Sequence, residues 1–266
     1  MPDPIQEHLE HLRANRYSRA TLTERERILR TLPHPTDLDR ETTQQWWASR
    51  RYRDDGAERA PSSLSAEASH AREFWRWCRQ VGHMDHNPAD WLPKVRQSKT
   101  MAVSVTEADL HGIIEDAREP MRQMIALAAM AGLRSAEIAA VRWEDIDRTN
   151  GVLWVRGGKG GKDRSVPLSA GLLAELGTPG TGPIVGKHMT AKAVSTAIGR
   201  HMRANGVNMT AHKLRARYAT RFIAATGDAV AAAEVLGHAD LSSILRYAVA
   251  SGDTMRRGAE AAGRIG

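Results

Sequence analysis

The sequence predicts a mainly α-helical protein with two domains and one small β-sheet, which lies in the second domain. Most of the chain repeats apolar side chains at three- and four-residue spacing, the periodicity of helices with one buried face. Only residues 151–168 show two short strand-like segments around a turn rich in glycine and lysine. A polar and basic stretch without periodicity, residues 94–100, follows the first group of helices. We therefore expect one domain at 1–93, a linker at 94–105 and a second domain at 106–266.

The first domain is expected to hold four helices, because prolines, glycines and polar residues interrupt its apolar periodicity. Ser18 can cap the second helix, and Gly82 closes the fourth. The expected ranges are 4–13, 18–32, 40–52 and 61–81. One face of the fourth helix carries an apolar stripe made of Leu64, Ala68, Ala71, Trp75 and Cys78. Four helices of this size form a bundle.

The second domain is expected to be helical apart from a β-hairpin. Thr106 with Asp109 resembles a capping arrangement at the start of its first helix, and Gly132 interrupts the apolar pattern of the next. The expected helices span about 106–117, 120–131, 135–141, 190–204, 211–225, 228–236 and 240–247. The expected strands are 151–156 and 163–168.

Composition excludes several classes of protein. The single cysteine, Cys78, excludes an internal disulfide and a cysteine-rich zinc site. The longest strongly apolar stretch, residues 124–133, is too short to cross a bilayer. No basic-then-apolar leader precedes the first helix. We therefore expect a soluble cytosolic protein without membrane association.

The charge of the chain favours a polyanionic partner. The formal net charge is +7 and the pI is about 9.9. Residues 1–95 carry equal numbers of basic and acidic side chains, so the whole excess lies in residues 96–266. This excess is compatible with nucleic-acid binding. A well-solvated basic surface is the alternative interpretation, and charge alone leaves both open.

A first motif with chemical potential is AGLRSAE, residues 131–137. It places Arg134 at the start of a short helix, directly after a glycine break. There, a planar guanidinium and the free amides of the helix can meet one phosphate. Glu137, one turn later, can hold the guanidinium in place. The alternative is an ordinary surface ion pair between Arg134 and Glu137.

A second motif is the hairpin turn GGKGGKD, residues 157–163. Its glycines allow Lys159 to approach a ligand phosphate, although a solvated turn would look the same. The turn does not match a P-loop, because the spacing is one residue short and Asp163 replaces the required hydroxyl. Nucleotide binding is therefore excluded for this segment.

Three further features lie near the C-terminal end. The segment TAHKLR, residues 210–215, sets His212 and Arg215 on one face of a helix, as a proton-transfer group beside an anion clamp. His238 follows a glycine break. Tyr247 comes nine residues later, in a chain with only four tyrosines. Taken singly, each is equally compatible with a structural role.

Together and in this order, these motifs resemble the tyrosine recombinase family, which includes phage integrases and Xer-type resolvases. The motifs cover about residues 106–250. Residues 1–93 match more loosely, through their length, their helix count and the exit at Asn87 and Pro88. The resemblance implies a SAM-like helical core-binding domain followed by an α+β catalytic domain of the Xer-like type. The main departure from the family pattern after Arg215 is the pair Ala216 and Arg217, where many relatives carry a histidine.

The resemblance also implies a role for each matched residue. Tyr247 is the nucleophile, Arg134 and Arg215 are the catalytic arginines, and Glu137 supports the first of them. The remaining matched residues are His212, His238 and Lys159, with Lys162 as a competitor for the position of Lys159. The implied enzyme is a site-specific recombinase that cleaves and rejoins DNA strands. Its reaction proceeds through a 3′-phosphotyrosine intermediate and a Holliday junction. It needs no metal, cofactor or ATP.

The implied partner is double-stranded DNA carrying core sites. A homotetramer is expected on DNA, with a monomer or weak oligomer when free, and an accessory directionality factor is a further candidate partner. Candidate DNA contacts are Arg72, Arg76, Arg79, Lys94, Arg96 and Lys99. Because the helical bundle begins almost at Met1, we expect a minimal integrase without an arm-binding domain. Its expected location is the cytoplasm of a bacterial cell, encoded by the host or by a phage.

Two alternatives share parts of this pattern. A type IB topoisomerase uses the same nucleophile but relaxes DNA as a monomer, and a test for recombinant product between two sites separates the two. A non-catalytic DNA-binding protein of the same fold is the second alternative. The full set of six polar site residues together with the AGLRSAE context favours the recombinase.

Overall fold

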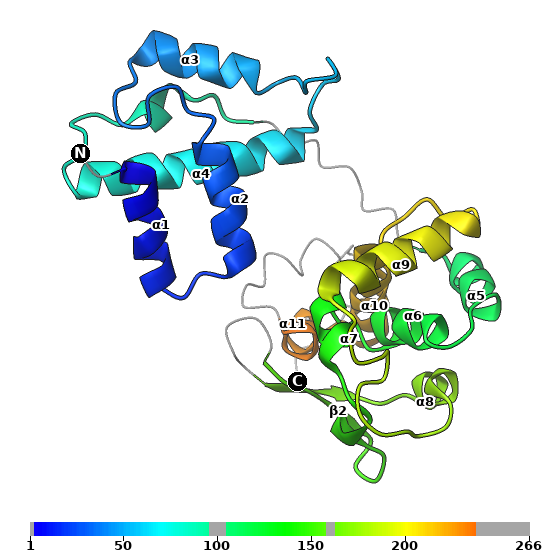
Figure 1. The fold of residues 1–266 in the computed structure, drawn as a ribbon. Helices are drawn as coiled ribbons and strands as arrows, with labels where there is room; N and C mark the ends of the chain where they lie inside the picture. The colour runs from blue at the N-terminus through cyan, green and yellow to red at the C-terminus, as the bar shows by residue number, and fades with distance from the viewer. Residues whose placement is uncertain (1–2, 96–104, 158–162, 238–266) are drawn as a thin grey trace, which may run out of the picture. The chain divides into compact units, whose positions relative to one another are not determined.

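Eleven α-helices, two 3-10 helices and three short strands form along residues 3–95, 105–157 and 163–237, which are the residues that the computed structural model describes. The chain divides into two compact units, Met1–Thr100 and Met101–Gly266. The elements of both units are shown in Figure 1. A mainly helical chain with one small sheet is the fold class that the sequence predicts, and the prediction is confirmed. The expected helix at 240–247 lies outside the described residues.

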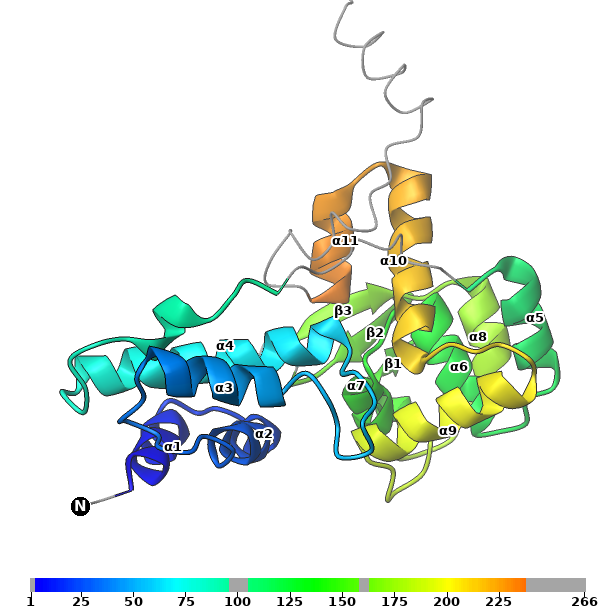
Figure 2. The same ribbon diagram turned by 90° about the horizontal axis from the view of Figure 1, so that it is seen from above.

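Three of the four α-helices of the first unit, α1, α2 and α3, have starts capped by short polar side chains. Asp3, Ser18 and Asp39 each accept a hydrogen bond from an amide of the first turn of the helix that follows. Helices α1 and α2 lie side by side against α4 in both views (Figures 1 and 2). The elements are α1 (Pro4–Ala14), α2 (Arg19–Leu29), α3 (Arg40–Ser49), α4 (Pro61–Gln80) and the 3-10 helix η1 (Pro88–Trp91).

Helix α4 supplies the centre of the core of the first unit. Of the predicted stripe, Ala68, Ala71, Trp75 and Cys78 are fully buried, and Leu64 packs against the same cluster while partly buried. Burial raises the pKa of the Cys78 thiol to about 12. The stripe meets apolar side chains of α1, α2 and α3, which are Ile5, Leu9, Leu29, Trp46 and Trp47. The predicted burial of this helix face is confirmed.

Two helices of the first unit are shorter than predicted. Helix α2 ends at Leu29 rather than at residue 32. Just after this end, the Thr31 hydroxyl donates to the carbonyl of Ile28. Helix α3 ends at Ser49 rather than at residue 52, because the following chain turns back and pairs with itself, with Tyr52 opposite Glu58. Pairing of this kind leaves no trace in helical periodicity.

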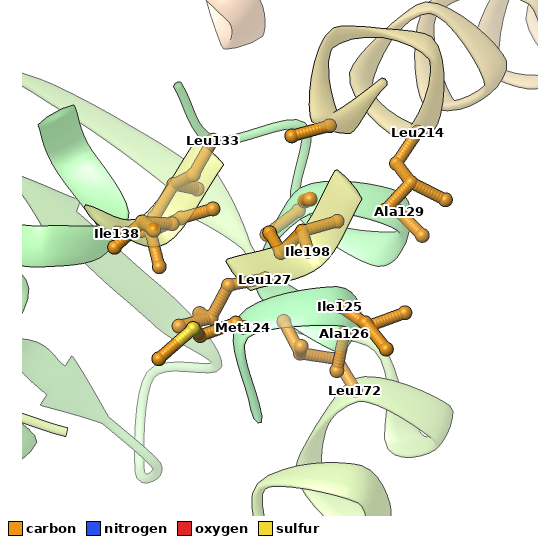
Figure 3. Close-up of a cluster of buried hydrophobic side chains, with 14 of the residues drawn as sticks. Met124, Ile125, Ala126, Leu127, Ala129, Leu133, Ile138, Leu172, Ile198 and Leu214 are labelled. Atoms are coloured by element: carbon orange, nitrogen blue, oxygen red, sulfur yellow. The ribbon is translucent and has the colours of Figure 1, made fainter. Parts of the chain in front are cut away.

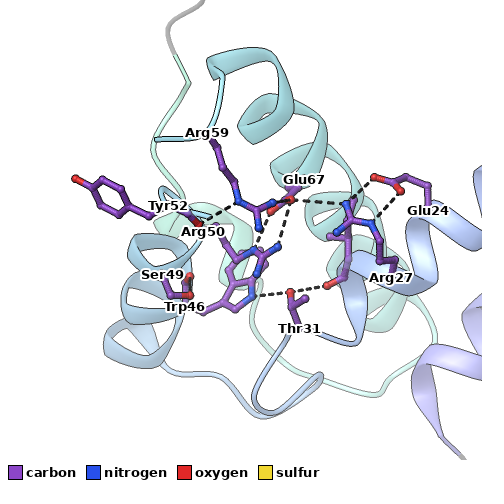
Figure 4. Close-up of polar contacts among 10 residues, drawn as sticks. Glu24, Arg27, Thr31, Trp46, Ser49, Arg50, Tyr52, Arg59 and Glu67 are labelled. Carbon is purple, nitrogen blue, oxygen red and sulfur yellow. Dashed lines mark hydrogen bonds and ion pairs between the residues drawn. The ribbon is translucent and has the colours of Figure 1, made fainter. Parts of the chain in front are cut away.

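A buried carboxylate joins three parts of the first unit. Glu67 on α4 is 2% exposed, and its oxygens accept hydrogen bonds from Arg50 Nε at 2.8 Å and from Arg59 Nη1 at 2.7 Å (Figure 4). Arg27 on α2 approaches the same carboxylate at 3.8 Å and is held at its other side by Glu24 at 2.7 Å. The negative charge of Glu67 therefore stands at the junction of α2, α4 and the segment that links α3 to α4.

The second unit is arranged around one apolar helix, α6. Seven consecutive residues of α6, from Gln123 to Ala129, are buried. Its side chains meet Leu172 of α8, Ile198 of α9 and Leu214 of α10 (Figure 3). The helices are α5 (Glu107–Glu115), α6 (Met121–Met130), α7 (Ser135–Ala140), α8 (Ala170–Leu176), α9 (Ala191–Ala204), α10 (Ala211–Thr226) and α11 (Ala229–Leu236), with the 3-10 helix η2 (Trp143–Asp145). The capping box predicted for Thr106 and Asp109 is present at the start of α5.

The sheet has three antiparallel strands in the order β1-β2-β3, where the sequence predicts a two-stranded hairpin. The strands are β1 (Ile146–Asp147), β2 (Val152–Val155) and β3 (Arg164–Pro167). Two elements are absent from the sequence-based prediction: β1, which at two residues is too short to show alternation, and α8, which begins at the cap Ser169. Helix α11 contacts β3 and lies beside α10 (Figure 2).

We predict that Glu67→Gln lowers the free energy of unfolding of the first unit by about 3 kcal/mol, because it removes the buried charge that pairs with the half-buried guanidinium groups of Arg50 and Arg59. The matched control is Glu24→Gln, which breaks an exposed pair and should cost less than about 1 kcal/mol. Urea unfolding followed by tryptophan fluorescence measures the difference. Five of the seven tryptophans lie in residues 1–95, so the signal reports mainly on this unit. Equal losses in the two variants would contradict the prediction.

Candidate active site

Arg134 is placed by a close approach between α6 and two neighbouring helices. Gly132, just after α6, has a φ of +64°, a conformation that glycine adopts without strain. A Cβ atom on Gly132 would lie 2.6 Å from side-chain atoms of both Leu236 and Tyr218. Only a glycine therefore fits here, and the chain turns directly into α7 with Arg134 as its N-cap residue. The glycine break that the sequence shows before Arg134 thus has a steric reason.

Glu137 on α7 is the centre of a buried ion cluster. Its carboxylate accepts hydrogen bonds from the amide of Arg134 at 2.7 Å and from Arg134 Nη1 at 2.8 Å. Arg164 donates to the same carboxylate from Nη1 at 2.8 Å and from Nη2 at 2.9 Å. Arg215 Nη1 lies 3.7 Å from it. Three arginines from α7, β3 and α10 therefore surround one carboxylate that is 8% exposed.

The cluster keeps Glu137 ionised. Burial alone would raise the pKa of this carboxyl, but the hydrogen bonds from Arg164 and from the Arg134 amide, with the charges of both arginines, lower it to about 2. The pKa is lower in the folded than in the unfolded chain, where it is near 4.5. The stabilisation by Glu137 is therefore complete above pH 4.5 and is lost as the pH falls toward 2.

Arg215 and His212 lie one turn apart at the start of α10, as the sequence predicts for a helix. Arg215 is 4% exposed, and its Nη1 donates to the carbonyl of Gly132 while its Nη2 donates to the carbonyl of Leu236 at 2.6 Å. His212 is exposed. The buried arginine is thus fixed by backbone contacts, and the histidine stands at the surface above it in the first turn.

Arg134, His212 and Arg215 line one cleft of about 290 Å³ between α7, α9 and α10. Ser135 and Thr210 line it too, at the starts of α7 and α10. The positive ends of helix dipoles favour anions. The cleft therefore combines two guanidinium groups, an imidazole and a helix start, which suits it to a phosphate group. The structure brings these predicted residues together although 81 positions separate Arg134 from Arg215.

The same three arginines also satisfy the end of α11. Arg164 Nε donates to the carbonyl of Val235 at 2.7 Å, and Arg134 Nη2 donates to the carbonyl of Gly237 at 2.8 Å, while Arg215 reaches the carbonyl of Leu236 between them. The last carbonyls of a helix lack partners within the helix and carry partial negative charge. Cations from three elements therefore hold the end of α11 beside the cleft.

Sequence reasoning missed Arg164. It is the first residue of β3, and its side chain is only 9% exposed. A signal was present, because Arg164 and the core residue Val166 are two positions apart in a strand and therefore share a face. An arginine on the buried face of a strand requires an acidic partner. Which acid it would meet was not visible, since Glu137 lies 27 positions away.

The departure from the family pattern at Arg217 has a structural counterpart. Arg217 is 8% exposed and donates to Glu107 on α5 at 2.5 and 2.6 Å, away from the cleft lined by Arg215. Its Nη1 also donates to the carbonyl of Ala129 at 3.3 Å. Hydrogen bonds from Arg217 lower the pKa of Glu107 although burial opposes this. Arg217 therefore fastens α10 to α5 and α6.

Several predicted site residues fall outside the described residues, namely Lys159, Lys162, His238, Tyr247, Arg96 and Lys99. Of the candidate DNA contacts in the first unit, Arg76, Arg79 and Lys94 are exposed. Arg72 is half-buried and donates to the carbonyl of Pro93 at 3.1 Å, so it holds the segment that leaves the bundle.

Within residues 3–95, 105–157 and 163–237, no three or more His, Cys, Asp or Glu side chains are grouped so that they could hold a metal ion. No helix within them combines the length and the apolar character that crossing a bilayer requires.

Solved structures share this fold across nearly the whole chain. A fragment of lambda integrase, residues 75–356, crystallised as a dimer bound to a COC′ core site, is 20% identical, with a TM-score of 0.73 over 94% of this chain and 95% of that one. The Tn1549 transposon integrase, residues 82–397, in complex with circular intermediate DNA, is 18% identical, with a TM-score of 0.73 over 96% of this chain and 98% of that one. At this identity the likeness establishes the fold alone.

Sequence relatives and a family model establish the family. Tyrosine recombinase XerC of Chromobacterium violaceum is 28% identical over 214 residues, which cover 70% of this chain and 68% of that protein. Tyrosine recombinase XerA of Pyrococcus furiosus is 31% identical over 175 residues, which cover 60% of this chain and 61% of that protein. The model of the phage integrase family matches residues 104–178 and 183–252, more than half of the chain. The chain is therefore a tyrosine recombinase that belongs to the phage integrase family.

Proposed function

We propose that this tyrosine recombinase is a site-specific enzyme that cleaves and rejoins double-stranded DNA through a 3′-phosphotyrosine at Tyr247. The observation that supports the proposal is the cleft lined by Arg134, His212 and Arg215, whose two arginines lie against the buried carboxylate of Glu137. Membership of the phage integrase family and the tyrosine recombinases among its relatives support the same reaction. Nothing observed favours the type IB topoisomerase or the non-catalytic DNA-binding protein.

The two arginines of the cleft would stabilise the charge that develops on the phosphate. Attack on a phosphodiester builds negative charge on the non-bridging oxygens, and preorganised guanidinium groups bind that charge best. Arg134 uses two of its five N–H donors on described residues, Glu137 and the Gly237 carbonyl, and its side chain is 29% exposed. A fixed guanidinium with donors left over suits a clamp for an incoming phosphate.

Proton transfer would fall to His212, His238 and Lys159. The phenol of a tyrosine has a pKa of about 10, so neighbouring groups must help to remove its proton at neutral pH. His212 is exposed in the cleft and stands next to the arginines, where it can take part. Lys159 would give a proton to the departing 5′ oxygen. The phosphotyrosyl bond keeps the energy of the broken strand, so a 5′ hydroxyl of a second duplex can reseal it without ATP.

The proposed partner is a pair of DNA core sites, which exchange strands through a Holliday junction. The reaction would take place within a homotetramer on DNA, and the free chain would be a monomer or weak oligomer. Two solved structures of the same fold, a lambda integrase dimer bound to a core site and a Tn1549 integrase with circular intermediate DNA, support a DNA partner. A directionality factor is a further proposed partner. The exposed Arg76, Arg79 and Lys94 are the proposed contacts of the first unit and its exit, with Arg72, Arg96 and Lys99 as weaker candidates.

A covalent trap tests the nucleophile. We expect the chain to become linked to nicked suicide duplexes, from which the released fragment diffuses before religation. The duplexes carry random sequence around the nick, and DNA that stays attached after denaturation identifies the site. Tyr247→Phe should abolish the linkage and keep DNA binding, because it removes only the phenol oxygen. Mapping of the DNA-linked peptide should recover residue 247. A linkage that survives Tyr247→Phe, or none with the wild-type chain, refutes the proposal.

A second prediction concerns the guanidinium of Arg134. Arg134→Lys keeps the charge but loses the planar fork, so we expect the rate of covalent linkage to fall by about 10²- to 10³-fold. The control is Arg122→Lys, which alters an ion pair with Glu175 on the same unit, away from the cleft. Single-turnover kinetics on the trapped duplex measures both rates. A decrease of similar size in both variants would mean that the cleft is not the reaction centre.

A third prediction concerns phosphate contacts of the first unit. Arg79→Gln should weaken DNA binding and make the slope of log affinity against log salt shallower by about 1, as the loss of one phosphate contact does. Arg13→Gln is the matched control, because Arg13 is also an exposed arginine in the last turn of its helix, α1. Fluorescence anisotropy over a salt series measures both slopes. An unchanged slope for Arg79→Gln would exclude this contact.

A further inference from the structure

We infer that Arg164 is a positioning residue of the recombination reaction, which holds Glu137 and the last turn of α11 so that Arg134 and Arg215 keep their aim at the reacting phosphate. The inference rests on the proposed function and adds a residue to it. Arg164 does not line the cleft, so it would act only through its neighbours.

The contacts of Arg164 join three elements at one point. Nη1 and Nη2 make a bidentate pair with the carboxylate of Glu137 at 2.8 and 2.9 Å, and Nε donates to the carbonyl of Val235 at 2.7 Å. A planar fork fixes both the distance and the orientation of a carboxylate. The side chain is 9% exposed, so water competes little for these bonds. Strand β3 is thereby bonded to α7 and to the end of α11.

Backbone geometry at the end of α11 fits this role. Gly237 caps α11 in the left-handed conformation, with φ of +62°. A Cβ atom there would lie 3.1 Å from Cδ and Nη1 of Arg164. A side chain at residue 237 would crowd the guanidinium and would strain the left-handed backbone, so glycine suits this position. The polypeptide that follows Gly237 leads to the proposed His238 and Tyr247, and Arg164 therefore anchors the point from which that segment departs.

Arg164 also lies at one foot of the loop that carries the proposed Lys159. The neighbouring Asp163 accepts a hydrogen bond from the amide of Gly157 at 2.8 Å, which ties the two feet of the loop together. The next residue, Arg164, donates to the carboxylate of Glu137, which also holds Arg134. Two adjacent residues, Asp163 and Arg164, thus connect the ends of the hairpin turn to the groups that would bind the phosphate.

The charge balance explains why the loss of Arg164 would be felt at the cleft. The charged groups that face Glu137 are Arg134 from α7, Arg164 from β3 and Arg215 from α10, while the polar groups at the end of α11 are carbonyls. Burial raises the pKa of the Tyr218 phenol on α10, and the charge of Arg164 opposes this rise. Without the bidentate pair, the pKa of the Glu137 carboxyl would rise, and the carboxylate that holds Nη1 of Arg134 would lose its fixed orientation.

The test compares Arg164→Gln, Arg164→Lys and the control Arg122→Gln. We expect Arg164→Gln to slow covalent linkage to the trapped duplex by about 100-fold, the cost of a misplacement of about 1 Å in an active site. DNA affinity should stay within about twofold. Arg164→Lys should recover only part of the rate, because an ammonium cannot form the bidentate pair. Arg122→Gln, which breaks an ion pair at 2.6 Å elsewhere in the unit, should keep the wild-type rate.

A second readout separates positioning from mere stability and needs no DNA. Titration of the Glu137 side-chain carboxyl by ¹³C NMR should show a pKa about 1 to 3 pH units higher in Arg164→Gln than in the wild-type chain. The acid limb of the linkage rate should move to higher pH with it, because the ionised carboxylate is the form that holds Arg134. Arg122→Gln should move neither.

The outcomes separate this inference from the proposed function. If the wild-type chain traps no DNA, the proposed function fails and the inference falls with it. If the wild-type chain traps DNA and Arg164→Gln does so at the same rate, only the inference fails. If Arg164→Gln slows linkage while the titration of Glu137 and the acid limb are unmoved, the residue acts through general stability, and the inference is likewise overturned.

Discussion

A single buried carboxylate, that of Glu137, sets the arrangement of the second unit. Glu137 would be costly to bury alone, and the three arginines around it would repel one another without it. Each charge is tolerated because the others are present. Since the arginines come from α7, β3 and α10, this mutual dependence also fixes the relative position of three elements that are distant in the chain. The cleft is a result of that balance.

The bundle repeats this arrangement around a second buried carboxylate. Glu67 is surrounded by Arg50, Arg59 and Arg27 in the same way. The difference lies in what the guanidinium groups do with their remaining donors. In the second unit they satisfy the free carbonyls at the end of α11, while around Glu67 the described bonds run to Glu24 and to the carbonyl of Tyr52. The cluster around Glu67 therefore joins helices, and the cluster around Glu137 also places N–H donors beside the candidate site.

Local signals in the sequence predicted most of the fold. The caps Ser18 and Thr106 and the stripe of α4 act within one or two helical turns, so they are visible without knowledge of the tertiary structure. Helix α8 and strand β1 were missed because seven and two residues carry little periodicity. The early end of α3 depends on pairing between Tyr52 and Glu58, which periodicity does not register.

The site was predictable to the extent that its residues come in short motifs. Arg134 with Glu137, and His212 with Arg215, show their helical spacing directly, and the fold brings the two pairs together. Arg164 carries no such spacing, because its partners are 27 and 71 positions away. The roles assigned to Lys159, His238 and Tyr247 lie outside the described residues and stay predictions.

The buried thiol of the bundle has a practical consequence. Cys78 is the only cysteine of the chain, it is fully buried, and its pKa is raised to about 12. Thiolate is the form that reacts with maleimides and iodoacetamides, so this residue is inert to them at neutral pH. The native chain therefore gives no labelled cysteine of its own when thiol reagents are used at neutral pH. Fluorophore pairs attached at introduced surface cysteines, one per unit, can therefore measure the distance between the two units without removal of Cys78.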